Sequence, residues 1–175
     1  DIRTYFNEKL PTLLFVGGSA GARVFNQLVT DHKEELTSRY NIINLTGDAS
    51  LNELSSNLYR VDYATELYQP LMNMADVVIT RGGANTIFEL LALRKPNLLI
   101  PLSGAASRGD QILNAESFEN AGYSEVIDEE TLNNISLSDE IHALYKNRQK
   151  YIDAMSKSDA KNGVTNILKL INQYS

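Results

Sequence analysis

The sequence of 175 residues contains no cysteine and no tryptophan, and it has only two histidines and four prolines. The absence of cysteine excludes disulfides, zinc–thiolate sites and a thiol nucleophile. Two histidines are too few for a histidine-rich metal site, so we expect no bound metal and no cofactor. No apolar run approaches the ~18 residues of a membrane-spanning helix.

The remaining composition is that of an ordinary globular protein, with 43% hydrophobic and 22% charged residues. The formal net charge of −6 disfavours sequence-independent binding to nucleic acid, so we expect no nucleic-acid partner. The length suits a single domain over residues 1–175. Because the chain starts with Asp1 rather than Met, we expect it to be a piece of a longer protein.

Short apolar runs alternate with stretches of helical periodicity along the chain. The runs predict strands at 13–16, 42–45, 58–61, 77–80, 98–100 and 124–127. The periodicity predicts helices at 22–37, 70–75, 84–93 and 108–121, with Gly122 ending the last, and two more over 137–172, broken near Ser158 or near Asn162. This alternation predicts an α/β fold with a doubly wound, mostly parallel sheet, whose ligands bind at the carboxyl ends of the strands.

The segment from Phe15 to Arg23 joins a buried strand to a helix through three glycines. Glycines allow a tight turn, and the first turn of the helix offers unbonded N–H groups and the positive end of its dipole. This arrangement is typical of a phosphate site, although the spacing is not the Gly-x-Gly-x-x-Gly of dinucleotide sites. Alternatively, the glycines serve only the packing of the helix on the strand.

The same segment contains Gly17-x-Ser19-x-Gly21, the pattern of a hydrolase nucleophile. A hydrolase also needs a downstream acid followed by a histidine. His32 lies in the helix that follows the motif directly, and His142 lies on a solvent-facing turn of a predicted helix. We therefore regard a hydrolase as the weaker interpretation.

A second glycine turn spans residues 78–86, where another buried strand meets Gly82 and Gly83 and then a helix. Two such turns favour a ligand with more than one anionic or polar group. Glu89 follows in an otherwise apolar part of this helix, where a buried carboxylate needs hydrogen-bond donors such as sugar hydroxyls. An ordinary exposed glutamate is the alternative.

A third strand-to-helix segment spans residues 101–111. Ser107 and Asp110 have the spacing of a capping box, which by itself would explain Asp110, whereas Gln111 has no comparable structural role. Each of the three segments also carries an arginine, and these arginines suit an anionic ligand such as a diphosphate if they share one edge of the sheet. The arginines are Arg23, Arg81 and Arg108.

Together, residues 15–23, 75–89 and 107–115 resemble the MurG family, in the form found in Gram-positive bacteria. These transferases add N-acetylglucosamine to the lipid-linked muramyl-pentapeptide precursor of peptidoglycan. The resemblance covers about residues 11–130. It implies a GT-B enzyme of two Rossmann-like domains, of which this chain is the C-terminal, donor-binding one.

The resemblance also implies which residues bind UDP-N-acetylglucosamine. Ser19 would face the diphosphate, Glu89 would hold the ribose hydroxyls, and the backbone at Ala64 would pair with uracil. Asp110 and Gln111 would hold the sugar hydroxyls, although some members of the family have glutamine where Asp110 stands. The full expected set is Gly18, Ser19, Ala64, Gly83, Ala84, Asn85, Thr86, Glu89, Asp110 and Gln111.

The resemblance places the acceptor site, the base that deprotonates the acceptor and the membrane contact in an N-terminal domain outside this chain. We therefore expect no catalytic residue here and no transfer by this chain alone. The parent enzyme would act as a peripheral protein at the cytoplasmic face of the bacterial membrane. Two alternatives remain: another GT-B enzyme acting on UDP-sugars, such as an epimerase or a different glycosyltransferase, or a donor-binding subunit without catalytic activity.

Overall fold

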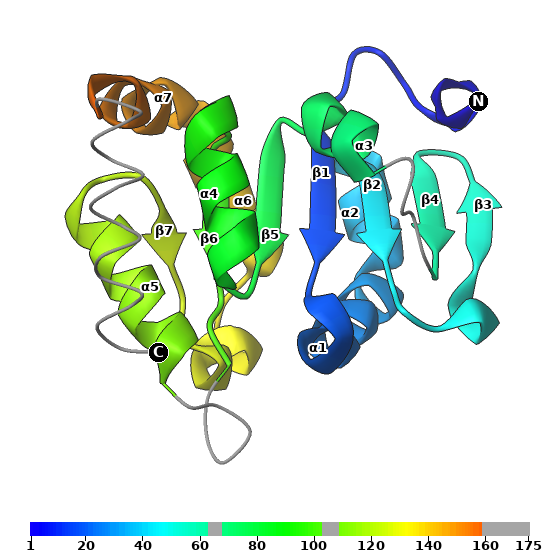
Figure 1. The fold of residues 1–175 in the computed structure, drawn as a ribbon. Coiled ribbons are helices and arrows are strands. Elements are labelled where there is room, and N and C mark those ends of the chain that lie inside the picture. The colour runs from blue at the N-terminus through cyan, green and yellow to red at the C-terminus, as the bar shows by residue number, and fades with distance from the viewer. Residues whose placement is uncertain (63–67, 103–108, 159–175) are drawn as a thin grey trace. The chain divides into compact units, whose positions relative to one another are not determined.

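The computed structural model describes residues 1–62, 68–102 and 109–158, with the backbone alone for residues 18–20. The chain forms two compact units, Asp1–Ile79 and Thr80–Ser175. Seven strands form a mostly parallel sheet in the order β3-β4-β2-β1-β5-β6-β7. The predicted α/β class is therefore confirmed (Figure 1).

The first unit contains a parallel ladder built from buried apolar runs. Leu13 of β1 pairs with Ile42 of β2, and Ile43 of β2 pairs with Tyr59 of β4. An antiparallel strand, β3, forms the edge of this ladder beside β4. It was not predicted, because a strand of three mostly exposed residues is too short to show a hydrophobic pattern. The strands are β1 (Thr12–Val16), β2 (Asn41–Leu45), β3 (Glu53–Ser55), β4 (Leu58–Val61) and β5 (Val77–Thr80), whose last residue belongs to the second unit.

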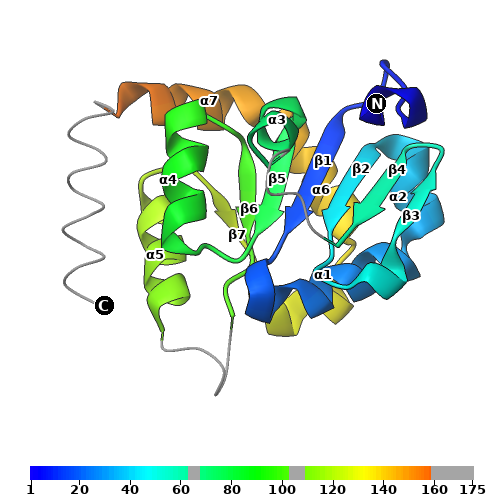
Figure 2. The ribbon, with the colours of Figure 1, turned by 45° about the vertical axis from the view of Figure 1, so that its right-hand side comes forward.

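Helices cover both faces of this ladder: α1 and α2 lie on one face and α3 on the other (Figures 1 and 2). The helix predicted at 22–37 is in fact two, because the backbone at His32 leaves the helical conformation with φ −115° and ψ 21°. The helical elements are η1 (Ile2–Tyr5), α1 (Gly18–Asp31), α2 (Lys33–Arg39), η2 (Ala49–Leu51) and α3 (Tyr68–Met74).

The second unit places α4 and α6 on opposite faces of β6 (Figures 1 and 2). Its predicted helix at 84–93 is confirmed, and Gly122 follows α5 with φ +81° as expected of a glycine beyond a helix end. The elements are α4 (Ala84–Leu93), β6 (Asn97–Leu99), α5 (Asp110–Asn120), β7 (Glu125–Val126), η4 (Glu129–Asn134), α6 (Leu137–Lys146) and α7 (Arg148–Lys157).

The C-terminal helices agree with the break predicted near Ser158, because α7 ends at Lys157 and Ser158 has an extended backbone. A further break, which was not predicted, falls at Asn147, where φ is −98° and ψ is 16°. The alternative break near Asn162 lies outside the described residues. Among the residues that the structure describes, no helix is both long enough and apolar enough to cross a membrane.

Candidate functional site

The turn between β5 and α4 presents the start of a helix without a side-chain cap. Gly82 has φ +89°, a conformation that side chains disfavour, and Gly83 is the N-cap with φ −63° and ψ 147°. The first helical bond runs from the N–H of Ile87 to the carbonyl of Gly83 at 3.1 Å. The N–H groups of residues 84–86 therefore precede the helical ladder, in the geometry that binds anions.

Two buried side chains hold this turn from within the second unit. The amide Nδ2 of Asn114 donates to the carbonyl of Gly82 at 3.1 Å. The Arg81 guanidinium donates to the carbonyl of Ile100 at 3.2 Å and to the carboxylate of Glu129 at 2.9 Å. The turn is thus anchored to α5, to the end of β6 and to η4.

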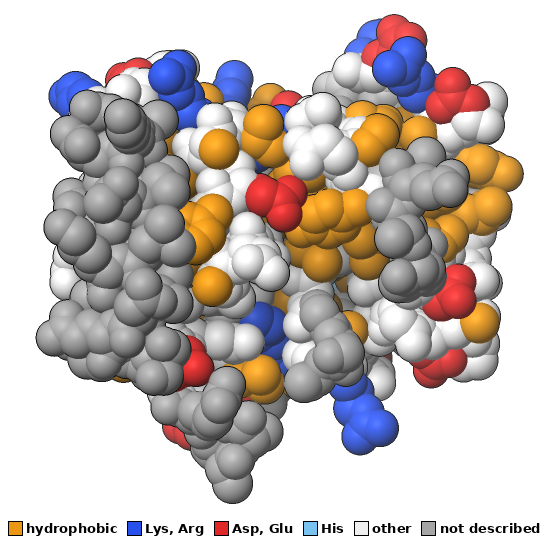
Figure 3. Space-filling model, viewed as in Figure 1, with side chains coloured by type: hydrophobic (Ala, Val, Ile, Leu, Met, Phe, Trp, Pro, Cys, Tyr) orange, Lys and Arg blue, Asp and Glu red, His pale blue; other side chains and the backbone are white. Residues whose placement is uncertain are grey.

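These contacts change the role expected of the arginines. Arg81 is only 3% exposed and is engaged with Glu129, so it stabilises the fold rather than adding free charge to a ligand edge. Arg23 is exposed on α1, and Arg108 lies outside the described residues. In the coloured part of Figure 3, Lys and Arg side chains are scattered and form no continuous basic patch.

The start of α5 approaches the same turn. A Cβ built on Gly82 would lie 3.6 Å from the backbone oxygen of Gln111. The side-chain Oε1 of Gln111 accepts from the N–H of Leu102 at 2.8 Å, which leaves the amide NH₂ group of Gln111 as a donor. The structure therefore brings the predicted phosphate turn together with Gln111.

The capping box predicted at the start of α5 is wrong. The N-cap is Gly109, with φ +85°, and it makes no side-chain cap bond. Asp110 is consequently the first residue of the helix instead of its third, and Ser107 lies outside the described residues. A carboxylate in the first turn is favoured by the helix dipole, and this places an acceptor beside the donor of Gln111.

Glu89 lies one turn after Asn85 on α4 and is partly buried. Its burial raises the pKa of the carboxyl group above the ordinary value, because desolvation penalises the charged form. The alternative of an ordinary exposed glutamate is therefore not what the structure shows. A ligand hydroxyl that donates a hydrogen bond would compensate part of the lost hydration.

The first glycine turn, in the other unit, has a steric cause. A Cβ on Gly17 would lie 2.7 Å from the backbone nitrogen and Cα of Ala22, so only glycine fits. Gly18 and Ser19 open α1, and the side chain of Ser19 is not among the described parts. His32 follows the far end of the same helix, about 20 Å along its axis from Ser19 at 1.5 Å per residue, which excludes this pair as a hydrolase dyad.

One predicted site residue, Ala64, lies outside the described residues. Asn114 was missed, although an asparagine three residues after Gln111 on the apolar side of a helix is a signal of a buried polar contact. Among the described residues, no group of three or more His, Cys, Asp or Glu side chains could hold a metal ion.

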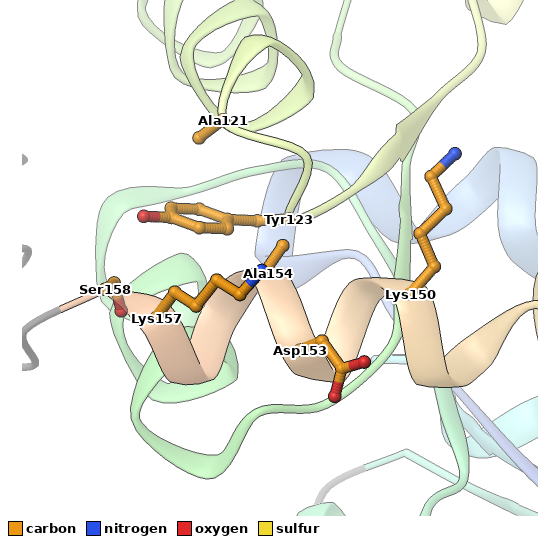
Figure 4. A pocket seen from close by; sticks show the side chains of 7 residues that line it. All are labelled: Ala121, Tyr123, Lys150, Asp153, Ala154, Lys157 and Ser158. Atoms are coloured by element: carbon orange, nitrogen blue, oxygen red, sulfur yellow. The ribbon is translucent and has the colours of Figure 1, made fainter.

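A pocket of about 630 Å³ lies elsewhere in the second unit, between the end of α5 and α7. Figure 4 shows Tyr123 above Ala154 and Lys157 of α7. Ala121, at the end of α5, is about 16 Å along the helix from Asp110, so this pocket is separate from the candidate site.

Comparison with known proteins identifies the relatives of this chain. The family model described as "Glycosyltransferase family 28 C-terminal domain" matches residues 12–171. The chain is 60% identical over 171 residues to the UDP-N-acetylglucosamine--N-acetylmuramyl-(pentapeptide) pyrophosphoryl-undecaprenol N-acetylglucosamine transferase of Streptococcus pneumoniae serotype 2 (strain D39 / NCTC 7466). That match covers 98% of this chain and 49% of the relative, so the chain spans about half the length of the curated relatives it matches.

Solved structures share the fold at lower identity. MurG from Acinetobacter baumannii has a TM-score of 0.65 and 23% identity, over 95% of this chain and 51% of that one. CalG4, the calicheamicin glycosyltransferase, has a TM-score of 0.67 and 16% identity, over 96% and 43% of the two chains. These likenesses establish the fold of a GT-B glycosyltransferase domain.

Proposed function

The chain belongs to the glycosyltransferase family 28 C-terminal domain family, and we propose that residues 1–175 are the donor-binding domain of a peptidoglycan N-acetylglucosaminyltransferase. The observation that carries this proposal is the 60% identity with the pneumococcal transferase, whose name states the donor sugar and the lipid-linked acceptor. The alternatives of a UDP-sugar epimerase or a transferase for another sugar are not favoured by these relatives.

The start of α4 is proposed to bind the diphosphate of UDP-N-acetylglucosamine. The N–H groups of Ala84, Asn85 and Thr86 precede the helical ladder, and no side chain at the N-cap Gly83 competes for them. When the bond between sugar and phosphate breaks, negative charge grows on the departing UDP. The aligned N–H groups and the dipole of α4 stabilise this charge, so the donor domain assists departure of the leaving group.

Three side chains are proposed to recognise the two sugars of the donor. Glu89 accepts hydrogen bonds from the ribose hydroxyls, which offset its partial loss of hydration. At the start of α5, Gln111 donates from its amide NH₂ while Asp110 accepts, so the pair can satisfy both sides of a sugar hydroxyl. The assignments of Gly18, Ser19 and Ala64 as further donor contacts remain predictions.

The acceptor half of the reaction is proposed to lie in a part of the longer relatives that this chain does not span. That part would contribute the lipid-linked muramyl-pentapeptide site, the base that deprotonates the acceptor, and peripheral contact with the cytoplasmic face of the membrane. No residue of this chain is assigned as that base. We therefore expect no sugar transfer by the 175-residue chain alone.

Isothermal titration of the chain with UDP-N-acetylglucosamine tests the proposal. We expect millimolar or tighter binding, with UDP-N-acetylglucosamine favoured over UDP-glucose. The variant Glu89→Ala should weaken binding about tenfold, since a charge-assisted bond contributes about 1.5–3 kcal/mol. Glu116→Ala, which removes an exposed carboxylate from α5, is the matched control and should bind as the unmodified chain does. Absence of binding at millimolar UDP-N-acetylglucosamine would overturn the proposal.

A further inference from the structure

Asn114 connects the two parts of the candidate site within the second unit. It lies one helical turn after Asp110 and Gln111 on α5, and it is only 7% exposed. Its Nδ2 donates to the carbonyl of Gly82 at 3.1 Å, a bond that spans 32 residues of sequence. The side chain therefore joins the helix that carries the sugar-binding groups to the turn that precedes α4.

The Gly82–Gly83 peptide has little steric restraint of its own. A Cβ on Gly83 would meet no atom within 4 Å, and one on Gly82 would meet only the backbone oxygen of Gln111 at 3.6 Å. Adjacent glycines populate many backbone conformations. A peptide between them can rotate unless a hydrogen bond holds it, and the bond from Asn114 is placed to do so.

The orientation of that peptide decides where the N–H of Gly83 points. In a trans peptide the carbonyl of one residue and the N–H of the next point in opposite directions, and no peptide bond among the described residues is cis. Because the carbonyl of Gly82 points at Asn114 on the buried side of α5, the N–H of Gly83 points away from that side. It can thus join the N–H groups that open α4.

We propose that Asn114 is a positioning residue that fixes the Gly82–Gly83 peptide, so that the Gly83 N–H takes part in binding the diphosphate of the donor. This inference rests on the proposed function, because it names a device that serves the same site. Asn114 acts through the backbone and need not touch the ligand. Its loss should therefore weaken binding of a diphosphate far more than binding of the same nucleoside with one phosphate.

The test compares UDP with UMP on the whole 175-residue chain, by titration followed in amide NMR spectra. Asn114→Leu keeps the approximate shape but removes the donor, and Asn114→Asp places a carboxylate against the carbonyl of Gly82. We expect both variants to bind UDP about tenfold more weakly, equivalent to about 1.4 kcal/mol, and UMP within about twofold of the unmodified chain. Asn120→Asp, at the exposed end of α5, is the matched control and should change neither affinity.

A second measurement needs no variant, in case Asn114 substitutions fail to fold. In the unmodified chain, the Gly83 amide resonance should shift more with saturating UDP than with saturating UMP. Equal Gly83 shifts, or an unchanged ratio of UDP to UMP affinity in a folded Asn114→Leu chain, would overturn the role of Asn114 while leaving donor binding intact. If the unmodified chain binds neither nucleotide, it is the proposed function that fails.

Discussion

The two glycine turns, at residues 15–23 and 78–86, look alike in sequence but need glycine for different reasons. At Gly17 the reason is space, because a Cβ would lie 2.7 Å from the backbone of Ala22. At Gly82 the reason is conformation, because φ is +89° while the nearest atom to a Cβ is 3.6 Å away. The first turn is therefore fixed by backbone contact, and the second depends on the side chains that surround it.

Each unit also contains a buried arginine, and the partners of these two arginines differ. Arg60 on β4 is 3% exposed and donates to Asn44 Oδ1, Thr30 Oγ1 and the carbonyl of Asn26, all of them neutral. Desolvation lowers the pKa of Arg60, and the nearby charge of Glu53 opposes that effect. These three hydrogen bonds connect β4 to β2 and to α1.

Arg81, equally buried, instead has the carboxylate of Glu129 at 2.9 Å. Removing the carboxylate that faces a buried guanidinium is costly, because the buried charge is then left uncompensated, whereas an arginine held by neutral acceptors has no such charge partner to lose. The first turn is thus fixed by backbone contact at Gly17, whereas the second is held by a charge pair and by the amide of Asn114. Each difference can be tested by substitution.

The largest expected effect comes from the steric turn. Gly17→Ala should lower the free energy of unfolding by about 3 kcal/mol, because the added Cβ must displace backbone atoms of Ala22 rather than a flexible side chain. Urea denaturation measures the change. Gly83→Ser is the matched control: its Cβ meets no atom within 4 Å, and serine is favoured at an N-cap, so stability should stay within ~0.5 kcal/mol or rise.

If the Gly17→Ala chain were as stable as the unmodified one, the first turn would tolerate a side chain and would not be sterically restrained. If Gly83→Ser caused a large loss of stability, the second turn would be sterically restrained as well. Either result would contradict the difference between the two turns.

The next effect concerns the charge pair. Glu129→Gln should cost about 1.5 kcal/mol, because Arg81 keeps the carbonyl of Ile100 but loses its charge-assisted bond to Glu129. The substitution replaces the carboxylate that faces Arg81 by a neutral amide. The exposed neighbour Glu130→Gln should change stability by less than ~0.5 kcal/mol. Urea denaturation measures the free energy of unfolding of both variants. Equal losses of stability in the two would refute a special role for Glu129.

Local signals predicted the elements well wherever neighbours in sequence decide the structure. The helix at 84–93 was placed correctly because glycines precede a strongly apolar periodic stretch. The break at Asn147 was missed, since a lone asparagine is a weak signal, and its side chain bonds back to the carbonyl of Ala143 at 2.9 Å. The capping box at Ser107 and Asp110 matched a pattern that the backbone at Gly109 overrides.

Long-range partners account for what the sequence could not predict in the site. Arg81 was expected at a ligand edge, but Glu129, 48 residues away, engages it in the fold. Asn114 likewise meets Gly82 across 32 residues. Residue types and spacing identify groups able to bind a phosphate, whereas tertiary contacts decide which of them remain available.

The two units also differ in how the pKa values of their carboxyl groups are shifted. In the second unit, burial raises the pKa of Glu125 on β7 to about 7, and a hydrogen bond and charge from Glu140 and the charge of Glu119 add to this, while Lys150 acts in the opposite direction. In the first unit, the side chain and backbone of Ser50 donate to Asp48 and lower its pKa. The two carboxyl groups therefore have opposite effects on how stability depends on pH.

The smallest expected effect follows from Glu125. The folded-state pKa of Glu125 is raised from 4.5 to about 7. Its contribution to the free energy of unfolding is therefore complete below pH 4.5 and is lost as the pH rises through about 7. After allowance for solvent screening, the loss between pH 5 and pH 8 is about 1 kcal/mol. Glu125→Gln should remove this pH-dependent loss and stabilise the chain at pH 8, whereas Glu116→Gln, on the exposed side of α5, should not.

A second measurement locates the titrating group. Amide-exchange protection factors should fall with pH at β7 but not at β2. An equal fall at both strands, or a pH dependence retained in Glu125→Gln, would place the titrating group elsewhere.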